Sequence, residues 1–180
     1  MNQYNLERRT LGNANLFLTR MNLVAPMPDL QFSPQSSVYV AVPLYKELEN
    51  AERLFQAWYS QDLPRTINGE ILFVVNNRSN PDTETYENNR QTFDLLSRLS
   101  SQNGRDNSGI HIVDKFSAGN AFPSGTYIGN VRNLTNTLVV KHAYGTGKNG
   151  IILSTDADCF PSQNVIARLH GLYLDKESVY

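Results

Sequence analysis

From residue 38 onward, two kinds of hydrophobic pattern alternate along the chain. Short, mostly apolar runs at 38–42, 70–75, 110–113 and 151–155 predict strands covered on both faces of a sheet. After each run, apolar residues recur at spacings of three and four, which is typical of one buried stripe on a helix. The stripes comprise Leu48, Ala51, Leu54, Phe55 and Trp58; Tyr86, Phe93, Leu96 and Leu99, with the stem of Arg90 among them; Ile128, Val131, Leu134, Leu138 and Val139; and Val165, Ile166, Leu169, Leu172 and Tyr173.

This alternation predicts an α/β fold, a three-layer α/β/α sandwich with a mostly parallel sheet and right-handed crossovers. Residues 1–37 are rich in Asn, Gln, Ser and Pro, so we expect an N-terminal extension followed by one domain over 38–180. Ligands of such sheets bind beyond the carboxyl ends of the strands. The loops at 43–47, 76–80 and 156–158 are therefore the candidate sites.

The last apolar run ends in two carboxylates one residue apart, Asp156 and Asp158. Where a strand breaks into a loop at its carboxyl end, positions i and i+2 can both turn toward one ligand. Their hard oxygen ligands suit Mg²⁺ or Mn²⁺, which share their coordination between protein, water and substrate phosphates. Solvated turn formers or a helix cap are the alternative interpretation of so short a motif.

Composition narrows the classes of partner. The chain has 16 basic and 17 acidic residues, so no global field recruits nucleic acid or an anionic membrane, and a polyanion must be bound locally. The single cysteine, Cys159, excludes an intrachain disulfide and favours a reducing compartment. No apolar stretch has the length of a signal peptide or of a membrane span. We therefore expect a soluble, cytoplasmic protein that does not bind nucleic acid.

Four short segments carry more information together than any of them does alone. They are Val-Pro-Leu-Tyr-Lys-Glu at 42–47, Val-Val-Asn-Asn-Arg-Ser-Asn at 74–80, Gly-Asn-Val-Arg-Asn at 129–133 and Leu-Ser-Thr-Asp-Ala-Asp at 153–158. In this order, and on these elements, they resemble the motifs of glycosyltransferase family 2. The resemblance covers 38 to about 170 and implies the GT-A fold of that family's nucleotide-sugar-binding domain.

The resemblance implies a nucleotide pocket at the first two strand ends. Pro43, Tyr45 and Glu47 would line it, with the backbone near Pro43 facing the base or ribose. Asn77 stands where the family usually carries an aspartate that accepts the N3 hydrogen of uracil. An amide carbonyl also accepts a hydrogen bond, but without a charge. The choice between a UDP-sugar and a GDP-sugar donor therefore stays open.

The other two segments imply the diphosphate and metal site. Arg132 would pair with the diphosphate; the alternative for this residue is a salt bridge on the surface of its helix. Asp156 would contact the ribose or a water bound to the metal, and Asp158 would bind the Mn²⁺ or Mg²⁺ that bridges the phosphates. The cation would stabilise the charge of the departing nucleoside diphosphate.

The reaction implied is transfer of a sugar from the nucleotide donor to a carbohydrate or other hydroxyl acceptor, usually with inversion at the anomeric carbon. Members of the family take their catalytic base from an acceptor half well downstream of the Asp-x-Asp. After Asp158 the chain has room for about one helix, so no base is assigned, and we expect the donor half of a longer enzyme. Apolar surface left uncovered in this way would favour a homo-oligomer.

Two further hypotheses stay open. One is a nucleotide-binding or protein-interaction module without catalysis, suggested by Asn77 and by the missing acceptor half. The other is a different doubly wound protein, such as a phosphatase or a receiver-like domain, in which Asp156 or Asp158 would be a nucleophile. The sequence disfavours this last hypothesis because it has no Lys or Thr at matching positions.

Overall fold

The computed structural model describes residue 28 and residues 30–103, 108–124, 128–147 and 150–177. Most of the predicted N-terminal extension lies outside the described residues. The elements are β1 (Ser36–Leu44), α2 (Leu48–Tyr59), β2 (Asn68–Asn76), α3 (Thr83–Gln102), β3 (Ser108–Lys115), α4 (Ile128–Thr146), β4 (Ile151–Ser154) and α5 (Val165–Glu177). Within this part of the chain, none of the helices combines the length and the apolar character that spanning a membrane requires.

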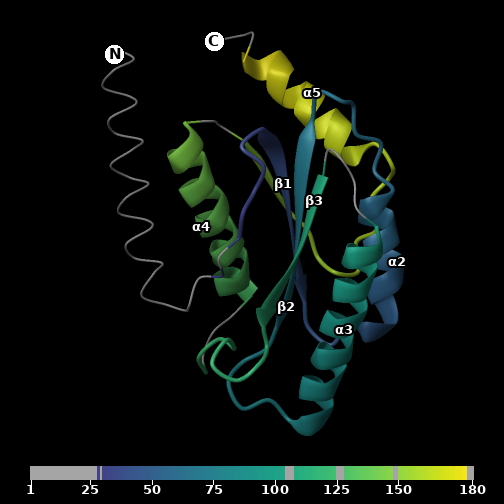
Figure 1. Cartoon of the computed structure of the whole chain (residues 1–180), viewed down its shortest axis with the longest axis vertical. Helices are drawn as coiled ribbons and strands as arrows, with labels where there is room; N and C mark the ends of the chain where they lie inside the picture. Colours follow the sequence, from purple (N-terminus) through teal and green to yellow (C-terminus); the bar gives the residue numbers. More distant parts are fainter. Residues whose placement is uncertain (1–27, 29, 104–107, 125–127, 148–149, 178–180) are drawn as a thin grey trace.

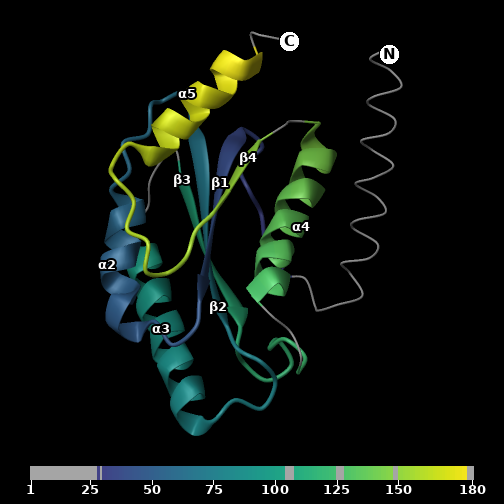
Figure 2. The ribbon, with the colours of Figure 1, turned by 180° about the vertical axis from the view of Figure 1, so that it is seen from behind.

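The four strands form one parallel sheet in the order β3-β2-β1-β4. The chain steps outward from β1 to β3 and then crosses back, so that β4 pairs with the other side of β1. Figures 1 and 2 show α2, α3 and α5 on one face of the sheet and α4 on the other. The predicted α/β fold with a parallel sheet is confirmed.

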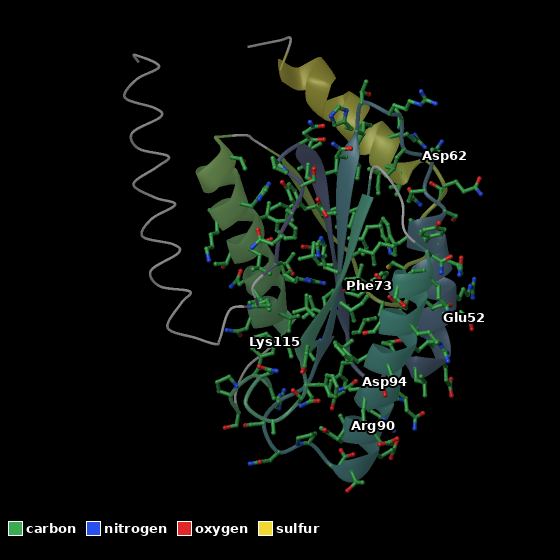
Figure 3. The ribbon with its side chains drawn as sticks, viewed as in Figure 1. Glu52, Asp62, Phe73, Arg90, Asp94 and Lys115 are labelled. Atoms are coloured by element: carbon green, nitrogen blue, oxygen red, sulfur yellow. The ribbon has the colours of Figure 1, made fainter. Side chains whose placement is uncertain are left out.

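An apolar layer lies on each face of the sheet. On the face of α2, α3 and α5, Phe73 of β2 belongs to the core (Figure 3). Its ring stacks with that of Phe55, with the two ring centroids 6.1 Å apart. On the α4 face, Leu72 of β2 and Leu134 of α4 belong to a second buried cluster. Strands that are covered on both sides lack an alternation of polar residues, which is why each strand shows in the sequence as a continuous apolar run.

Three of the strands run longer than their apolar runs. Ser36 is paired with Asn68, and Asn76 with Lys115, because polar residues at a strand end can still join the backbone ladder. The fourth strand ends at Ser154, one residue earlier than predicted. Hydrophobic patterns report side-chain burial, not backbone pairing, and they therefore do not define where a strand begins and ends.

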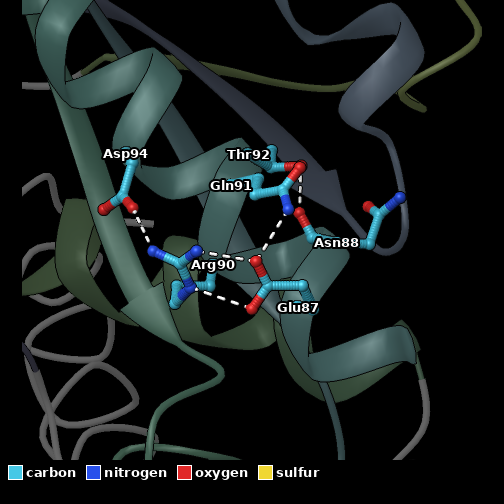
Figure 4. Close-up of polar contacts among 6 residues, drawn as sticks. All are labelled: Glu87, Asn88, Arg90, Gln91, Thr92 and Asp94. Carbon is cyan, nitrogen blue, oxygen red and sulfur yellow. Dashed lines mark hydrogen bonds and ion pairs between the residues drawn. The ribbon is translucent and has the colours of Figure 1, made fainter. Parts of the chain in front are cut away.

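The buried side of α3 differs from the prediction. Its N-terminal half buries Thr85, Asn89 and Thr92, whereas Tyr86 is 38% exposed. Arg90 does not lie along the stripe: its guanidinium pairs with Glu87 and Asp94 on the exposed side (Figure 4). The helix is turned because Asn89 makes hydrogen bonds to the strand ends that an apolar side chain could not make.

The last helix also departs from its predicted stripe. Ile166 is fully buried and belongs to the same core cluster as the strands, but Leu172 is 60% exposed. Among the side chains of α5 that the structure describes, those in the core or packed against it are Val165, Ile166 and Ala167, in the first turn. The prediction that Leu172 is buried was wrong, because helical spacing identifies one side of a helix but not how far along it the core extends.

The close approach of Gly150 to β1 generates a prediction. A Cβ at Gly150 would lie 2.7 Å from the ring of Tyr39 and 3.2 Å from the carbonyl oxygen of Ser37. Tyr39 is 2% exposed and cannot easily move away. We expect Gly150→Ala to lower the free energy of unfolding by about 1–3 kcal/mol, as overpacking usually does, in urea denaturation.

Gly129→Ala is the matched control. A Cβ at Gly129, in the first turn of α4, meets no atom within 4 Å. This substitution should raise the free energy of unfolding by up to about 1 kcal/mol, because alanine has the higher helix propensity. Equal stability of the two variants would contradict the packing assigned to Gly150.

Candidate functional site

The carboxyl ends of β1 and β4 lie side by side where the order of the strands reverses. Val38 is in register with Ile151 and Ala41 with Ser154. α4 connects β3 to β4 across the other face, so its first turn lies at the same carboxyl edge (Figure 2). In open parallel sheets, this reversal point is the usual place for a ligand.

The loop after β4 exposes both aspartates of the predicted motif. The amide of Thr155 donates to the carbonyl of Ala41 at 3.0 Å, which extends the pairing with β1 by one residue. Ala157 is 7% exposed and joins the core, while its neighbours Asp156 and Asp158 are both exposed. Because Ala157 anchors the loop from between the two aspartates, both carboxylates are presented to solvent at the sheet edge.

Arg132 reaches this loop from the first turns of α4. Its Nη2 lies 2.5 Å from Oδ1 of Asp156, and both side chains are partly exposed. The Nε atom of Arg132 is buried and has no hydrogen-bond partner among the described residues. The structure thus joins two residues that the sequence analysis singled out separately. The pair connects α4 to the loop after β4, so it differs from the alternative for Arg132, a salt bridge on the surface of its own helix.

A buried glutamine, Gln61, holds the far end of the same loop. This residue is fully buried just after α2, where its Nε2 donates to the carbonyl of Ser162 at 2.8 Å and its Oε1 accepts from the amide of Ile166 at 3.4 Å. Phe160 of the same loop also contacts α2, since the guanidinium of Arg53 lies 3.9 Å from its ring centroid. No pattern in the sequence indicated this role of Gln61, since a polar residue after a helix usually indicates a solvated turn.

The three residues predicted to line a pocket in the β1 loop differ in how far their side chains are exposed. Pro43 is buried in β1, Tyr45 is 52% exposed, and Glu47 accepts a hydrogen bond from Asn50 at 3.1 Å. Lys46 between them has a left-handed backbone with φ of 58°. Of the three predicted pocket residues, Tyr45 therefore has the side chain most open to solvent.

Asn77 is turned into the protein. It is 3% exposed, and its Nδ2 donates to the carbonyls of Phe116 at 3.1 Å and Arg78 at 2.8 Å. Its Oδ1 accepts from Nδ2 of Asn89 at 3.0 Å. These bonds use both amide hydrogens and one lone pair of the oxygen. A contact between Asn77 and a nucleotide base stays a prediction. Asn77 follows β2, which β1 separates from β4 and its aspartates in the sheet.

Asn89 is a site residue that the sequence analysis missed. Fully buried on α3, it accepts from the amide of Lys46 at 2.9 Å and donates to the carbonyl of Asn76 at 3.0 Å. Asn76 in turn donates to the carbonyl of Leu44 at 2.9 Å. Side-chain amides thus connect the ends of β1 and β2 to α3. An asparagine within a polar helical segment gives no sign of this in the sequence.

Two charged residues at the end of β3 also serve the fold. Lys115 (Figure 3) is 2% exposed, and its burial lowers its pKa. Its Nζ lies 5.4 Å from the ring centroid of Phe122. Burial alone would raise the pKa of Asp114, but hydrogen bonds from Ser117 and Phe116 hold it below its usual value. Asp114 therefore shapes the turn after β3.

The carboxylate oxygens of Asp156 and Asp158 suit a cation whose remaining ligands are water and phosphate oxygens. Among the described residues, no three His, Cys, Asp or Glu side chains gather around one point. Asp156 and Asp158 would thus be the protein's share of a coordination shell completed by water and phosphate oxygens, as is usual for Mg²⁺. Asp156 is already paired with Arg132, so Asp158 is the carboxylate more available to a cation.

No family model and no curated protein matches the chain. The glycosyltransferase resemblance therefore stays a prediction from the four segments. The geometry of the strand ends is the basis on which function can be argued.

The amide connections of Asn89 generate a prediction. Replacing Asn89 with Ala would leave the amide of Lys46 and the carbonyl of Asn76 without their side-chain partner at the covered sheet edge. We expect the free energy of unfolding to fall by about 2–4 kcal/mol, because lost buried hydrogen bonds and a cavity both contribute.

Gln91→Ala is the control for this variant. Gln91 lies on the exposed side of the same helix and hydrogen-bonds only locally to Glu87, at 2.7 Å (Figure 4). Its replacement should change the free energy of unfolding by no more than about 0.5 kcal/mol. If urea denaturation gave the two variants the same stability, the connecting role of Asn89 would be wrong.

Proposed function

We propose that this chain is the donor-binding domain of a GT-A-type glycosyltransferase, which holds a nucleoside-diphosphate sugar through Mn²⁺ or Mg²⁺ for transfer to an acceptor hydroxyl. The observation that carries the proposal is the meeting of Arg132 and Asp156 next to Asp158, at the edge where the strand order reverses. Chemically, this edge offers a cationic fork and two hard oxygen donors within one short stretch of surface.

A diphosphate is the ligand that uses both kinds of group. The planar guanidinium of Arg132 can bind two phosphate oxygens at once, and the N-terminal end of α4 favours negative charge. Asp158 would coordinate the cation that those same phosphates share. A monoanion such as a carboxylate would engage Arg132 but would bring few oxygens to the cation.

Three residues of the chain would each contact a different part of the bound donor and cation. Arg132 would orient the diphosphate, Asp158 would fix the cation, and the exposed ring of Tyr45 would offer an apolar face to the base or the sugar. A bound divalent cation would supply positive charge against the nucleoside diphosphate that departs in sugar transfer. No described residue is assigned as the base that deprotonates the acceptor.

The ion pair between Arg132 and Asp156 couples the binding of the cation to the binding of the diphosphate. Without ligand, the guanidinium of Arg132 neutralises Asp156 and would repel a cation placed beside it. Once phosphate oxygens engage Arg132, Asp156 is released to face the cation. Cation and diphosphate should therefore bind cooperatively, each raising the affinity for the other by the same factor.

A nucleotide-binding or protein-interaction module without catalysis is the second candidate. The observation that favours it is Asn77, whose amide is used to connect neighbouring loops and carries no charge to read a base. Release of free sugar from a nucleotide-sugar donor by the purified chain would count against this candidate.

Calorimetry with UDP and GDP, each with Mn²⁺ or Mg²⁺, tests the proposed function. We expect one of these nucleotides to bind in the presence of metal, and Asp158→Asn to weaken binding about tenfold or more, a loss of about 1.4 kcal/mol in binding free energy. Asp94→Asn is the control, since Asp94 is an exposed carboxylate on α3 away from this edge. Absence of binding for every pair of nucleotide and metal would exclude the proposal.

The cooperativity has a separate test in the same titrations. The affinity for Mn²⁺ should rise about fivefold or more when the diphosphate is present, within the usual range of coupling between sites. Arg132→Gln should weaken diphosphate binding and abolish this coupling. Arg90→Gln, which removes an exposed, ion-paired arginine of α3, should preserve it. Equal coupling in both variants would show that the Arg132–Asp156 pair plays no part.

A further inference from the structure

The segment from Leu30 to Ser36 approaches the sheet at the amino ends of its strands, on the face covered by α4. Leu30 and Phe32 both pack against the apolar cluster on this face. The ring of Phe32 is 7% exposed and meets three aromatic rings edge-on: Tyr39 of β1 at 5.4 Å, His111 of β3 at 5.1 Å and His142 of α4 at 5.4 Å between centroids. One side chain of this segment therefore contacts two strands and the helix on top of them.

A buried carboxylate fixes the same segment. Glu70 of β2 is 1% exposed and accepts hydrogen bonds from the amide of Ser33 at 2.8 Å, from Nε2 of His111 at 2.8 Å and from the hydroxyl of Ser36. A Cβ at Gly109 would lie 1.9 Å from Oε2 of Glu70, so the neighbouring backbone leaves room for the carboxylate alone. Glu70 is held in one position by β3 and, through Ser33, holds the segment.

The boundary between this segment and the sheet is marked in the backbone. The register of β1 against β2 shifts between Ser36 and Val38, so Ser36 is separated from the regular ladder by a bulge-like irregularity. The amide of Ser36 also donates to the carbonyl of Ser33 at 3.0 Å, which closes a turn within the segment. The backbone thus divides near Ser37 into a turn, whose last residue Ser36 still pairs with Asn68 of β2, and a regular strand.

We propose that residues 30–36 form a clasp that opens as a unit while the sheet stays folded, with Glu70 as its lock, and that opening loosens the carboxyl-terminal half of α4. The clasp is held by the packing of Leu30 and Phe32, by the bonds of Glu70, and by the hydrogen bonds of Tyr39 to Ser36 and of Asn68 to Gln35. By contrast, β1 and β2 share a regular ladder from Val38 to Leu44. Units with few buried contacts open at lower free energy than the core. α4 follows because His142 packs on Phe32.

Protonation of Glu70 releases the lock. Burial alone would raise the pKa of Glu70, but hydrogen bonds from His111, Ser36 and Ser33 outweigh it and hold this pKa below the ordinary value of 4.5. In the open clasp those from Ser36 and Ser33 are lost and the carboxyl group returns toward its ordinary pKa. The opening equilibrium is therefore independent of pH at neutrality and rises by up to about tenfold per pH unit as the pH falls below about 4.5.

The titratable groups that face Glu70 come from three elements. Burial, and secondarily the charge of Glu70, raises the pKa of Tyr39 on β1 to about 12, so its hydroxyl stays neutral throughout the acid range. His111 on β3 donates to Glu70 directly. His142 on α4 faces the rings of Phe32 and Tyr39, and its Nε2 is buried with no hydrogen-bond partner among the described residues. Glu70 is the acid within this cluster.

Hydrogen exchange of the whole chain from pH 7 to pH 3.5, corrected for intrinsic rates, tests the clasp. Amides of 30–36 and 138–147 should lose about tenfold of their protection below pH 4.5, while those of 38–44 and 70–76 keep theirs. Glu70→Gln should show the open clasp already at pH 7, without further acid dependence. Glu87→Gln is the matched control: this carboxylate has a pKa of about 2 in its hydrogen bonds to Arg90, on α3, and should behave as the unmodified chain.

Phe32→Ala makes the test independent of the buried charge. This variant should open the clasp at pH 7 and retain the acid dependence, because Glu70 is intact. Simultaneous loss of protection in the clasp and in the sheet at every pH would overturn the proposal, as would a protected clasp in Glu70→Gln. If Glu70→Gln does not fold, the acid titration of the unmodified chain and of Phe32→Ala decides alone.

Discussion

The hydrogen bonds of Asn89 are the constraint on which the carboxyl edge of the sheet depends. A parallel sheet covered by helices on both faces ends in backbone groups that have left the ladder but cannot reach water, and such groups need a partner. Asn89 supplies one to the amide of Lys46 and the carbonyl of Asn76, and it also binds the side chain of Asn77. The positions of the β1 and β2 loops follow from these bonds, and so does the rotation of α3 that buries a polar side.

At the two ends of the sheet, buried side chains of different chemistry form hydrogen bonds to the backbone groups. At the carboxyl edge the buried partners are neutral amides, whose hydrogen bonds do not change with pH. At the amino edge the partner is the carboxylate of Glu70, which gives stronger bonds but makes them depend on its ionisation. α4 spans both ends: Arg132 in its first turns meets Asp156, and His142 near its other end meets Phe32. A helix placed in this way connects the candidate ligand site to the clasp.

Buried residues hold the loop that carries the Asp-x-Asp motif in a defined position. The buried Ala157 and Gln61 hold the loop from the core side, so that Asp156 and Asp158 project from a fixed base. Exposed ion pairs contribute little to folding stability, and the Arg132–Asp156 pair is better understood through what it presents to a ligand. A cationic fork and two carboxylates at a strand-order reversal form a local charge pattern that the overall net charge of −1 conceals.

The sequence by itself determined the α/β architecture, because strands buried on both faces and helices with one buried side leave different hydrophobic periods. It also determined that two carboxylates follow a strand, since that depends only on neighbours along the chain. Which polar residues are exposed at the strand ends and which are hydrogen-bonded within the fold was decided by the tertiary structure. Asn89 meets Lys46 across 43 residues and Arg132 meets Asp156 across 24, and no local period encodes such pairs. Asn77 shows the consequence: its place in a motif suggested a ligand contact, whereas its partners are neighbouring loops and α3.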